Sequence, residues 1–249
     1  MKLSIDLNAD LGEGVASERE LLPLISSASI ACGLHAGDPS TMSASMRAAQ
    51  AAGVAVGAHP SLNDRENFGR TELPVSPEEV FELVVYQLGA FQAMAQSLGI
   101  RPRHLKLHGA LYNLAARDRR LAEAAVRAVL AVDRSLILFC LGGSALAEAG
   151  AAHHLRLAQE VFADRNYLPD GSLVPRTQPN ALLHDPAEAA QRVMRMLQEK
   201  VVAAIDGREI PIEAETVCVH GDTPAAVLFA RELRAHLRAV GITIAPFPA

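Results

Sequence analysis

The sequence predicts an α/β fold in which seven strands and the helices between them form a (β/α) barrel. Short apolar runs that end in polar or glycine-rich turns alternate with helical stretches along the 249 residues. In three of these runs, polar residues occupy every second position, so one face of each strand is polar. The central strands of an open doubly wound sheet are apolar on both faces, so this pattern favours a closed barrel with a polar interior.

Seven segments carry the strand pattern. They are residues 3–7, 28–32, 54–58, 104–108, 136–141, 157–162 and 216–219. The first, fourth and last of them have the polar face. Because strands joined by helices run parallel, their carboxyl ends should meet at one mouth of the barrel, where such folds carry their chemistry.

Four helices are expected to begin where a capping residue precedes a proline, at Asp38-Pro39, Ser76-Pro77, Asp185-Pro186 and Thr223-Pro224. Ser76 and Glu79 also match a capping box. Three helices should end at Gly53, Gly99 and Gly241. Residues 205–213 are expected to form an inserted hairpin with its turn at Asp206-Gly207. No linker interrupts the pattern, so we expect one barrel domain over residues 1–249.

Composition excludes several classes of protein. The net charge of −5, the pI near 6.0 and an aromatic content of 4% argue against a nucleic-acid surface. The sequence contains no run of 18 uncharged apolar residues that would indicate a membrane span, and we expect no signal peptide before the first strand. Cys32, Cys140 and Cys218 are far apart and form no CxxC motif, which fits a cytoplasmic protein without disulfides or a structural zinc site.

Polar residues gather at the carboxyl ends of the predicted strands. In chain order they are Asp6, Asn8, Asp10, Glu13, Cys32, His35, His59, Lys106, His108, Glu160, Asp164, Arg165, His220 and Asp222. Any one of them could simply cap a turn. Random placement would scatter such residues over both ends of the strands, so together they predict a site at one mouth.

A metal site is one interpretation of these residues. Asp10, His35 and His59 could form a carboxylate–histidine–histidine site with open coordination positions. The three ligands would come from three different loops, so their spacing is not diagnostic. Histidines that cap turns remain the alternative.

Cys32 and Lys106 are further candidates. Cys32 could be a thiolate nucleophile, although a small residue in the wall of the site is favoured because the other two cysteines resemble strand filler. Lys106 lies between Leu105 and Leu107 and should point into the barrel. There it could hold an anionic or phosphorylated group, or act as a general acid.

Two loops, residues 61–70 and 165–171, are long enough to close over a ligand. They carry Arg70 and Arg165, whose guanidinium groups suit a carboxylate, but both loops could also be plain surface. No GxxxxGK[ST] motif occurs, and no GxGxxG follows a strand.

The first strand cannot place all its acids at one point. At about 3.3 Å per residue, Asp6 and Asp10 lie roughly 13 Å apart. We therefore expect Asp10 and Glu13 near the mouth, and Asp6 as a brace of the interior.

Six blocks of the sequence resemble the LamB/YcsF family. They span residues 6–13, 31–39, 57–70, 106–112, 160–165 and 219–224, in order along nearly the whole chain. The resemblance implies the irregular seven-stranded barrel of glycoside hydrolases and polysaccharide deacetylases. It also implies ATP-dependent opening of 5-oxo-L-proline to L-glutamate by the A subunit of a 5-oxoprolinase, with ATP and Mg²⁺ as cofactors and subunits B and C as partners.

The resemblance also implies roles for individual residues. The catalytic candidates are Asp10, His59, Lys106, His108 and Asp222. The substrate-binding candidates are Asp6, Asn8, Glu13, His35, Arg70, Glu160, Arg165 and His220. In this scheme Lys106 and a loop arginine hold phosphate or the substrate carboxylate, and Asp10 or His59 activates water. Asp6, Asn8 and Glu13 position magnesium or the substrate amide, and His108, His220 and Asp222 transfer protons.

Two other functions stay open from the sequence. The first is a metal-dependent amide hydrolase or deacetylase that acts without ATP. The second is a non-catalytic scaffold whose partners hold the active site.

Overall fold

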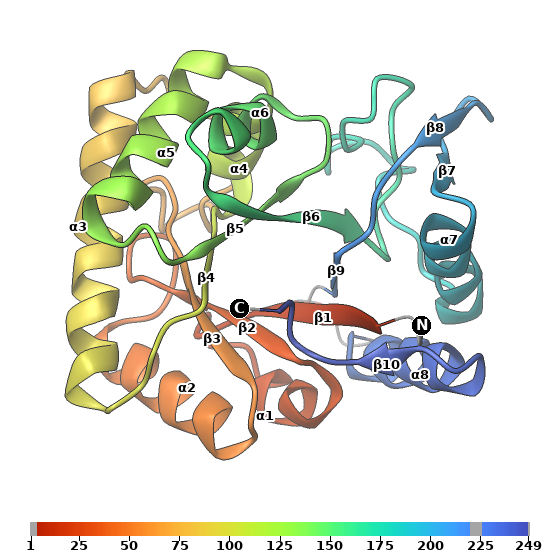
Figure 1. Ribbon diagram of the computed structural model, residues 1–249, viewed down its shortest axis with the longest axis horizontal. Coiled ribbons are helices and arrows are strands. Elements are labelled where there is room, and N and C mark those ends of the chain that lie inside the picture. The colour runs from red at the N-terminus through yellow and green to blue at the C-terminus, as the bar shows by residue number, and fades with distance from the viewer. Residues whose placement is uncertain (1–3, 220–225, 249) are drawn as a thin grey trace.

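The computed structural model describes residues 4–219 and 226–248, and in it seven parallel strands close into a barrel (Figure 1). In order around the barrel they are β1 (Ser4–Leu11), β2 (Ser27–Ala31), β3 (Ala55–His59), β4 (His104–Lys106), β5 (Ile137–Leu141), β6 (Arg156–Phe162) and β9 (Thr216–Cys218). β9 pairs with both β6 and β1, which closes the ring. The predicted seven-stranded barrel is confirmed.

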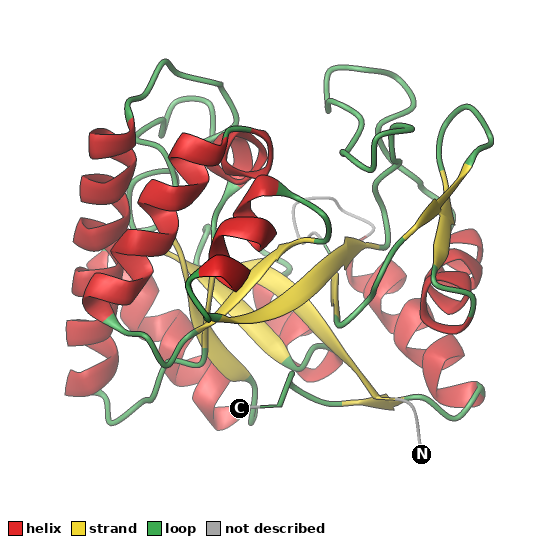
Figure 2. Ribbon diagram, turned by 45° about the horizontal axis from the view of Figure 1, so that its top comes forward, coloured by secondary structure: helices red, strands yellow, loops and turns green. Residues whose placement is uncertain are grey.

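Helices cover the outside of the barrel (Figure 2). They are α1 (Glu18–Leu21), the 3₁₀ turn η1 (Leu22–Leu24), α2 (Pro39–Ala51), α3 (Pro77–Ser97), α4 (Gly109–Arg117), α5 (Arg119–Val132), α6 (Ala145–Ala152), α7 (Pro186–Gln198) and α8 (Ala226–Ala239). α3 and α5 lie side by side on the left in Figure 1, and α7 packs beside α8. Within the described ranges, no helix combines the length and the apolar character that a membrane span requires.

Capping explains where several helices begin and end. Asp38, Ser76 and Asp185 accept hydrogen bonds from the first turns of α2, α3 and α7, and the capping box of Ser76 with Glu79 is present. The three predicted glycines have positive φ values, 70° at Gly53, 67° at Gly99 and 83° at Gly241. The expected start at Thr223-Pro224 lies outside the described residues.

Two strand boundaries differ from the prediction by more than one residue. β1 continues to Leu11, beyond the predicted 3–7, because it pairs with β2 as far as Ile30. β4 ends at Lys106, so the prediction of 104–108 was too long. His108 instead takes the position before α4, and its N–H donates to the carbonyl of Pro60 at 2.8 Å.

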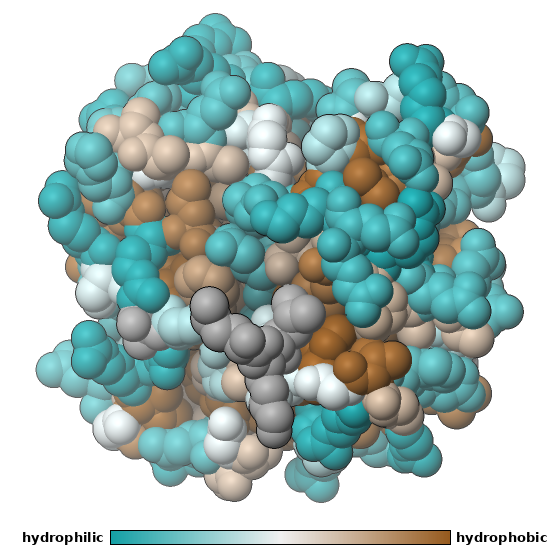
Figure 3. All heavy atoms as spheres, turned by 45° about the vertical axis from the view of Figure 1, so that its right-hand side comes forward, coloured by the Kyte–Doolittle hydropathy of each residue, from teal (hydrophilic) through white to brown (hydrophobic). Residues whose placement is uncertain are grey.

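Three short strands lie outside the closed ring. β10 (Thr243–Ile244) pairs with the start of β1 and was not predicted, because two residues give no readable pattern. β7 (Val201–Ala203) and β8 (Glu209–Pro211) form an antiparallel ribbon at the right of Figure 2. Its turn includes Asp206-Gly207 as predicted, but its first strand precedes the expected range of 205–213. Figure 3 shows the side of the molecule that carries α7, α8 and this ribbon as a mainly hydrophilic surface with scattered hydrophobic patches.

The two faces of β1 explain how the barrel combines a core with a polar interior. Leu7 and Ala9 are fully buried in the hydrophobic core. Asp6, Asn8 and Asp10 alternate with them and are also buried, but their side chains contact polar groups of other strands. The same strand therefore supports the core with one face and builds the site with the other.

Candidate functional site

Lys106 on β4 is the centre of a buried polar network inside the barrel, and only 3% of it is exposed. Its Nζ lies 2.9 Å from Oδ1 of Asp10 and 2.9 Å from Oε1 of Glu160, and it donates to Oδ1 of Asn8 at 2.9 Å. The Sγ of Cys218 is 3.1 Å away. Burial opposes the charge of Lys106, but the attraction of the surrounding acids outweighs it and holds the pKa well above its usual value.

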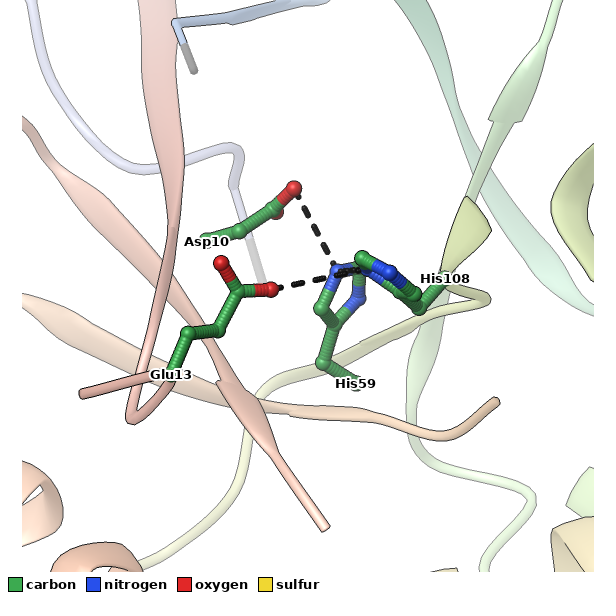
Figure 4. A group of neighbouring side chains, drawn as sticks. All are labelled: Asp10, Glu13, His59 and His108. Carbon is green, nitrogen blue, oxygen red and sulfur yellow. Dashed lines mark hydrogen bonds and ion pairs between the residues drawn. The ribbon is translucent and has the colours of Figure 1, made fainter. Parts of the chain in front are cut away.

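Asp10, at the carboxyl end of β1, connects Lys106 to two histidines. Its Oδ1 faces Lys106, whereas its Oδ2 lies 3.3 Å from Nε2 of His59 (Figure 4). His59 in turn lies 2.9 Å from His108, measured from Nε2 to Nδ1. One carboxylate thus bridges the buried lysine and the histidine pair.

Backbone carbonyl groups fix the tautomers of both histidines. Nδ1 of His59 lies 2.8 Å from the carbonyl oxygen of Lys106, and Nε2 of His108 lies 2.8 Å from that of Phe68. A carbonyl oxygen only accepts hydrogen bonds, so each of these nitrogens carries a proton. In the neutral rings, Nε2 of His59 and Nδ1 of His108 are therefore unprotonated. These two lone pairs face each other at 2.9 Å, a contact that a proton or a metal ion between them would make favourable.

Glu13 and His35 complete the group. Nε2 of His35 lies 3.1 Å from Oε1 of Glu13, and Nδ1 of His108 lies 3.5 Å from the same oxygen. The rings of His35 and His108 stack with centroids 3.8 Å apart. Burial lowers the pKa of His35 to about 3 and that of His108 well below its usual value. Both rings are therefore neutral at pH 7.

Four side chains place potential metal ligands together, and we call them the acceptor cluster: Asp10, Glu13, His59 and His108. One ligand atom from each lies within 4.8 Å of all the others. Two imidazole nitrogens and two carboxylate oxygens suit ions such as Zn²⁺. The sequence suggested Asp10, His35 and His59 instead. In the structure His35 points its Nε2 at Glu13 and is not in the cluster.

The turn that carries Glu13 is held by a carboxylate from α1. Glu18 accepts hydrogen bonds from the N–H groups of Gly12, Glu13 and Gly14 at 2.9 Å each, and of Val15 at 3.1 Å. Successive N–H groups that converge on one anion form a rigid turn. Glu18 thereby fixes the direction in which Glu13 leaves β1.

Residues 61–71, which we call the 61–71 loop, pack against the histidines. Phe68 and Gly69 both have positive φ values, 57° and 67°. A Cβ atom on Gly69 would lie 2.8 Å from Cβ of His35 and 2.8 Å from Cδ2 of His108. The close approach therefore requires glycine, and the strained backbone of Phe68 presents its carbonyl group to His108.

Asp6 and Asn8 extend the polar network deeper into the barrel. Asp6 accepts hydrogen bonds from the hydroxyl groups of Ser26 at 2.6 Å, Ser27 at 2.7 Å and Thr216 at 2.6 Å. Asn8 donates to the same Thr216 at 2.8 Å. Burial raises the pKa of Asp6 despite these hydrogen bonds. The three hydroxyl groups tie β1 to β2 and β9 through Asp6.

The two loop arginines occupy different environments. Arg70 is exposed, and its guanidinium lies 4.9 Å from the ring centroid of Phe68. Arg165 is 5% exposed and donates to the carbonyl of Val174 at 2.6 Å, and burial lowers its pKa to about 10. Tyr167 in the same loop is fully buried, so the first residues of this loop pack into the protein, whereas Pro169 and Asp170 are exposed.

Of the three remaining candidates, only Cys32 lies among the described residues. Cys32 is buried, and burial raises the pKa of its thiol to about 12, so it is not a thiolate at neutral pH. This favours the interpretation of Cys32 as a small residue in the wall of the site. His220 and Asp222 lie outside the described residues.

Sequence reasoning missed three contributors to the site. Cys218 was interpreted as strand filler, although its alternation with Val217 and Val219 could have placed it inside the barrel, where it contacts Lys106. Glu18 and the carbonyl group of Phe68 gave no signal, because both act through backbone geometry that only the folded turn and loop define.

Two comparisons with known sequences support one family. A sequence model of the LamB/YcsF family matches residues 5–249. A protein of Tolumonas auensis, named as the A subunit of 5-oxoprolinase, is 49% identical over 245 residues, which cover 96% of this chain and 98% of that protein.

Two solved structures resemble the fold. The lactam utilization protein of Thermus thermophilus superposes with a TM-score of 0.91 at 43% identity, over 98% of this chain and all of that one. A family 4 carbohydrate esterase of Streptomyces lividans, solved with acetate, gives a TM-score of 0.53 at 12% identity over 97% of this chain and 91% of that one. The second similarity concerns the fold alone.

Proposed function

Because the chain belongs to the LamB/YcsF family, we propose that it is the A subunit of an ATP-dependent 5-oxoprolinase. This enzyme would open 5-oxo-L-proline to L-glutamate while ATP is hydrolysed to ADP and phosphate. The observation that carries the proposal is the 49% identity, over 96% of the chain, to a protein that bears the name of this 5-oxoprolinase component. The name of the Thermus protein, a lactam utilization protein, supports a cyclic amide as the substrate.

The chemistry of a five-membered lactam explains the need for ATP. Its amide is unstrained and resonance-stabilised, so water attacks it slowly. Transfer of the γ-phosphoryl group of ATP to the lactam oxygen makes the ring carbon electrophilic. Water then adds to that carbon, the C–N bond breaks, and the nitrogen takes a proton to become the amine. A second water releases phosphate from the γ-carboxyl group, which gives glutamate.

The acceptor cluster supplies groups for the water step in this proposal. His59 presents an unprotonated Nε2 and is held through Nδ1 by the carbonyl group of Lys106. Such a nitrogen can take a proton from attacking water, while Asp10 beside it stabilises the resulting imidazolium. His108 can carry the proton onward, because its Nδ1 lies 2.9 Å from Nε2 of His59.

Lys106 acts in this proposal through Asp10. Its ammonium group is almost fully buried and contacts protein atoms of Asp10, Glu160, Asn8 and Cys218. Lys106 therefore orients Asp10, while Arg70 is an exposed cation that can meet a substrate carboxylate or a phosphate. Glu13 and His35, which lie 3.1 Å apart, would contact the lactam amide.

The cofactors and partners of the proposal are ATP, Mg²⁺ and subunits B and C. They follow from the family resemblance, and the word "subunit" in the name of the Tolumonas protein supports an assembly. The proposal assigns no nucleotide site to this chain alone.

A metal-dependent amide hydrolase that acts without ATP is the second candidate, and the acceptor cluster is the observation that favours it. One experiment separates the two functions. The pure chain, with and without its co-expressed partner subunits, is incubated with 5-oxoproline, ATP and Mg²⁺, and glutamate and ADP are measured together. We expect both products in equal amounts, and only from the complex.

Two results from controls, one without ATP and one with an Asp10→Asn complex, would contradict the proposal. Glutamate formed by the isolated chain without ATP would identify the metal-dependent hydrolase. An unchanged rate in a complex that carries Asp10→Asn would show that the site lies on the partners and that this chain is a scaffold.

A further inference from the structure

We propose that one divalent transition-metal ion binds in the acceptor cluster, with Asp10, Glu13, His59 and His108 as its ligands. The inference deepens the proposed function and rests on it for the role of the site, since it adds a cation where the lactam would be opened. With the ion bound, Nε2 of His59 and Nδ1 of His108 serve as ligands, so the proton transfers proposed above for these two nitrogens belong to the metal-free site. The binding itself is argued from the side chains alone.

The facing lone pairs of the two histidines are the first argument. Carbonyl oxygens of Lys106 and Phe68 hold the proton of each ring on the outer nitrogen. Nε2 of His59 and Nδ1 of His108 then point at each other at 2.9 Å. Metal-binding histidines commonly donate their second N–H to a carbonyl group in this way, which fixes the ring and leaves the inner nitrogen for the metal.

The distances between the ligand atoms are the second argument. Nε2 of His59 lies 2.9 Å from His108 and 3.3 Å from Asp10, and Nδ1 of His108 lies 3.5 Å from Glu13. A tetrahedral ion with bonds of about 2.1 Å places neighbouring ligand atoms about 3.4 Å apart. These three distances lie within about half an ångström of that spacing, and all four ligand atoms lie within 4.8 Å of one another.

The charge of the site is the third argument. Asp10, Glu13 and Glu160 bring three carboxylates to this network, and Lys106 brings one positive charge. Over these four side chains, three negative charges and one positive charge leave two negative charges. A divalent cation balances them in a part of the protein where water is largely excluded.

The donor set also indicates the class of ion. Imidazole nitrogens with carboxylate oxygens suit Zn²⁺, Co²⁺ and Mn²⁺. Mg²⁺ prefers oxygen ligands and keeps much of its water, so it fits this cluster poorly. His35 supports the site from outside by its contact with Glu13.

The experiment measures metal binding by the chelator-treated full chain, without substrate, ATP or partners. Calorimetry with Zn²⁺ gives the stoichiometry and Kd, and Co²⁺ adds a visible absorption band that reports nitrogen and oxygen ligands. We expect one ion per chain with a micromolar Kd or tighter. His59→Gln and His108→Gln should each weaken binding by at least ~100-fold, beyond the roughly 10–100-fold that loss of a supporting contact causes.

Matched variants separate ligands from neighbours. His153→Gln removes a surface histidine that pairs with Glu123 at 2.8 Å, and it should leave the Kd unchanged. Glu13→Gln should weaken binding more than His35→Gln, because only Glu13 is a proposed ligand. Circular dichroism and thermal melting of each variant identify those that remain folded.

Three results would overturn the inference. They are no binding of Zn²⁺, Co²⁺ or Mn²⁺ by the wild-type chain, binding that persists in both His59→Gln and His108→Gln, and loss of the ion in His35→Gln but not in Glu13→Gln. None of them depends on lactam chemistry. A chain that binds no metal but still releases glutamate within the complex would therefore refute the metal site and leave the proposed function intact.

Discussion

Lys106 shows how much a single residue contributes to this site. Alternation with Leu105 and Leu107 was enough to predict that its side chain enters the barrel. Its partners could not be predicted, because Asp10, Glu160 and Cys218 come from three other strands and their meeting depends on the register of the closed barrel. Sequence spacing within one strand carries no information about that register.

Removal of the Lys106 charge should destabilise the protein. Lys106→Met leaves Asp10 and Glu160 buried without their shared cation, and breaking a buried ion pair costs about 3–5 kcal/mol. We expect a loss of that size in the free energy of unfolding, measured by urea denaturation. Lys106→Met combined with Glu160→Gln should recover part of it, because one of the two carboxylates is neutralised.

A surface pair provides the control for this prediction. Lys200 pairs with Glu213 at 2.8 Å, but 66% of its side chain is exposed, so Lys200→Met should cost less than about 1 kcal/mol. If the two lysine variants lost similar stability, the network around Lys106 would not be held by charge.

At the scale of elements, the turn after β1 and the 61–71 loop aim the side chains of the site. The starts of α2, α3 and α7 were predicted, because a capping residue before proline is a local signal that needs no tertiary contact. The contributions of the turn and the loop to the site were not predicted, because Glu18 and the backbone of Phe68 act only once the chain has folded. β10 was missed for the same reason, since two residues form a strand only beside β1.

Gly69→Ala should disturb the histidine pair. The added Cβ would meet His35 and His108 at 2.8 Å, and the positive φ of Gly69 adds strain of about 1–3 kcal/mol. We expect lower stability and slower glutamate release by the assembled complex. Gly171→Ala is the matched control, because its φ is 85° but no atom lies within 4 Å of the new Cβ. Equal effects of the two variants would show that the contact with the histidines is unimportant.

Glu18→Gln should loosen the turn that carries Glu13. The carboxylate accepts four backbone hydrogen bonds, and bonds to a charged group contribute about 1.5–3 kcal/mol each, although a glutamine oxygen can keep some of them. We expect the free energy of unfolding to fall by about 1–3 kcal/mol in urea denaturation. Glu20→Gln, at an exposed position of the same helix, should change it little. A larger effect at Glu20 than at Glu18 would contradict this explanation.

At the scale of the whole molecule, the closed barrel could be predicted because three strands with one polar face do not fit an open sheet. The site could be predicted only as a set of residues at one mouth. Which residues touch depends on closure through β9, whose pairing with β1 and β6 sets β1 opposite β4. The sequence suggested His35 as a third ligand beside Asp10 and His59. The geometry of the closed barrel instead brings Glu13 and His108 to these two residues.

Burial of neutral histidines makes the stability of the metal-free protein depend on pH. Burial lowers the pKa of His35 and His104 to about 3 and that of His108 well below its usual value. Below pH 6.5 the unfolded chain binds protons that the folded chain does not. The free energy of unfolding therefore decreases as the pH is lowered, by up to about 1.4 kcal/mol per pH unit for each histidine. The raised pKa of Asp6 acts in the opposite sense, because above about pH 3.8 the folded chain holds a proton that the unfolded chain has released. This contribution increases stability as the pH is lowered toward 3.8.

Urea denaturation between pH 7 and pH 5 measures this dependence. His104 stacks on Phe139 and is not one of the four residues of the acceptor cluster, so His104→Gln should reduce the slope of stability against pH by the contribution of one histidine. A stability that is flat or rises as the pH falls would contradict neutral burial of these rings.

The central claim is that lactam opening takes place at Asp10, His59 and His108. Its most direct measurement is the rate of glutamate release by the assembled complex in which this chain carries His59→Gln, compared with His153→Gln on the surface. Loss of a general base lowers the rate by roughly 10²–10⁴-fold, so we predict a decrease in that range for His59→Gln and none for His153→Gln. A folded, assembled His59→Gln complex that releases glutamate at the wild-type rate would contradict the claim.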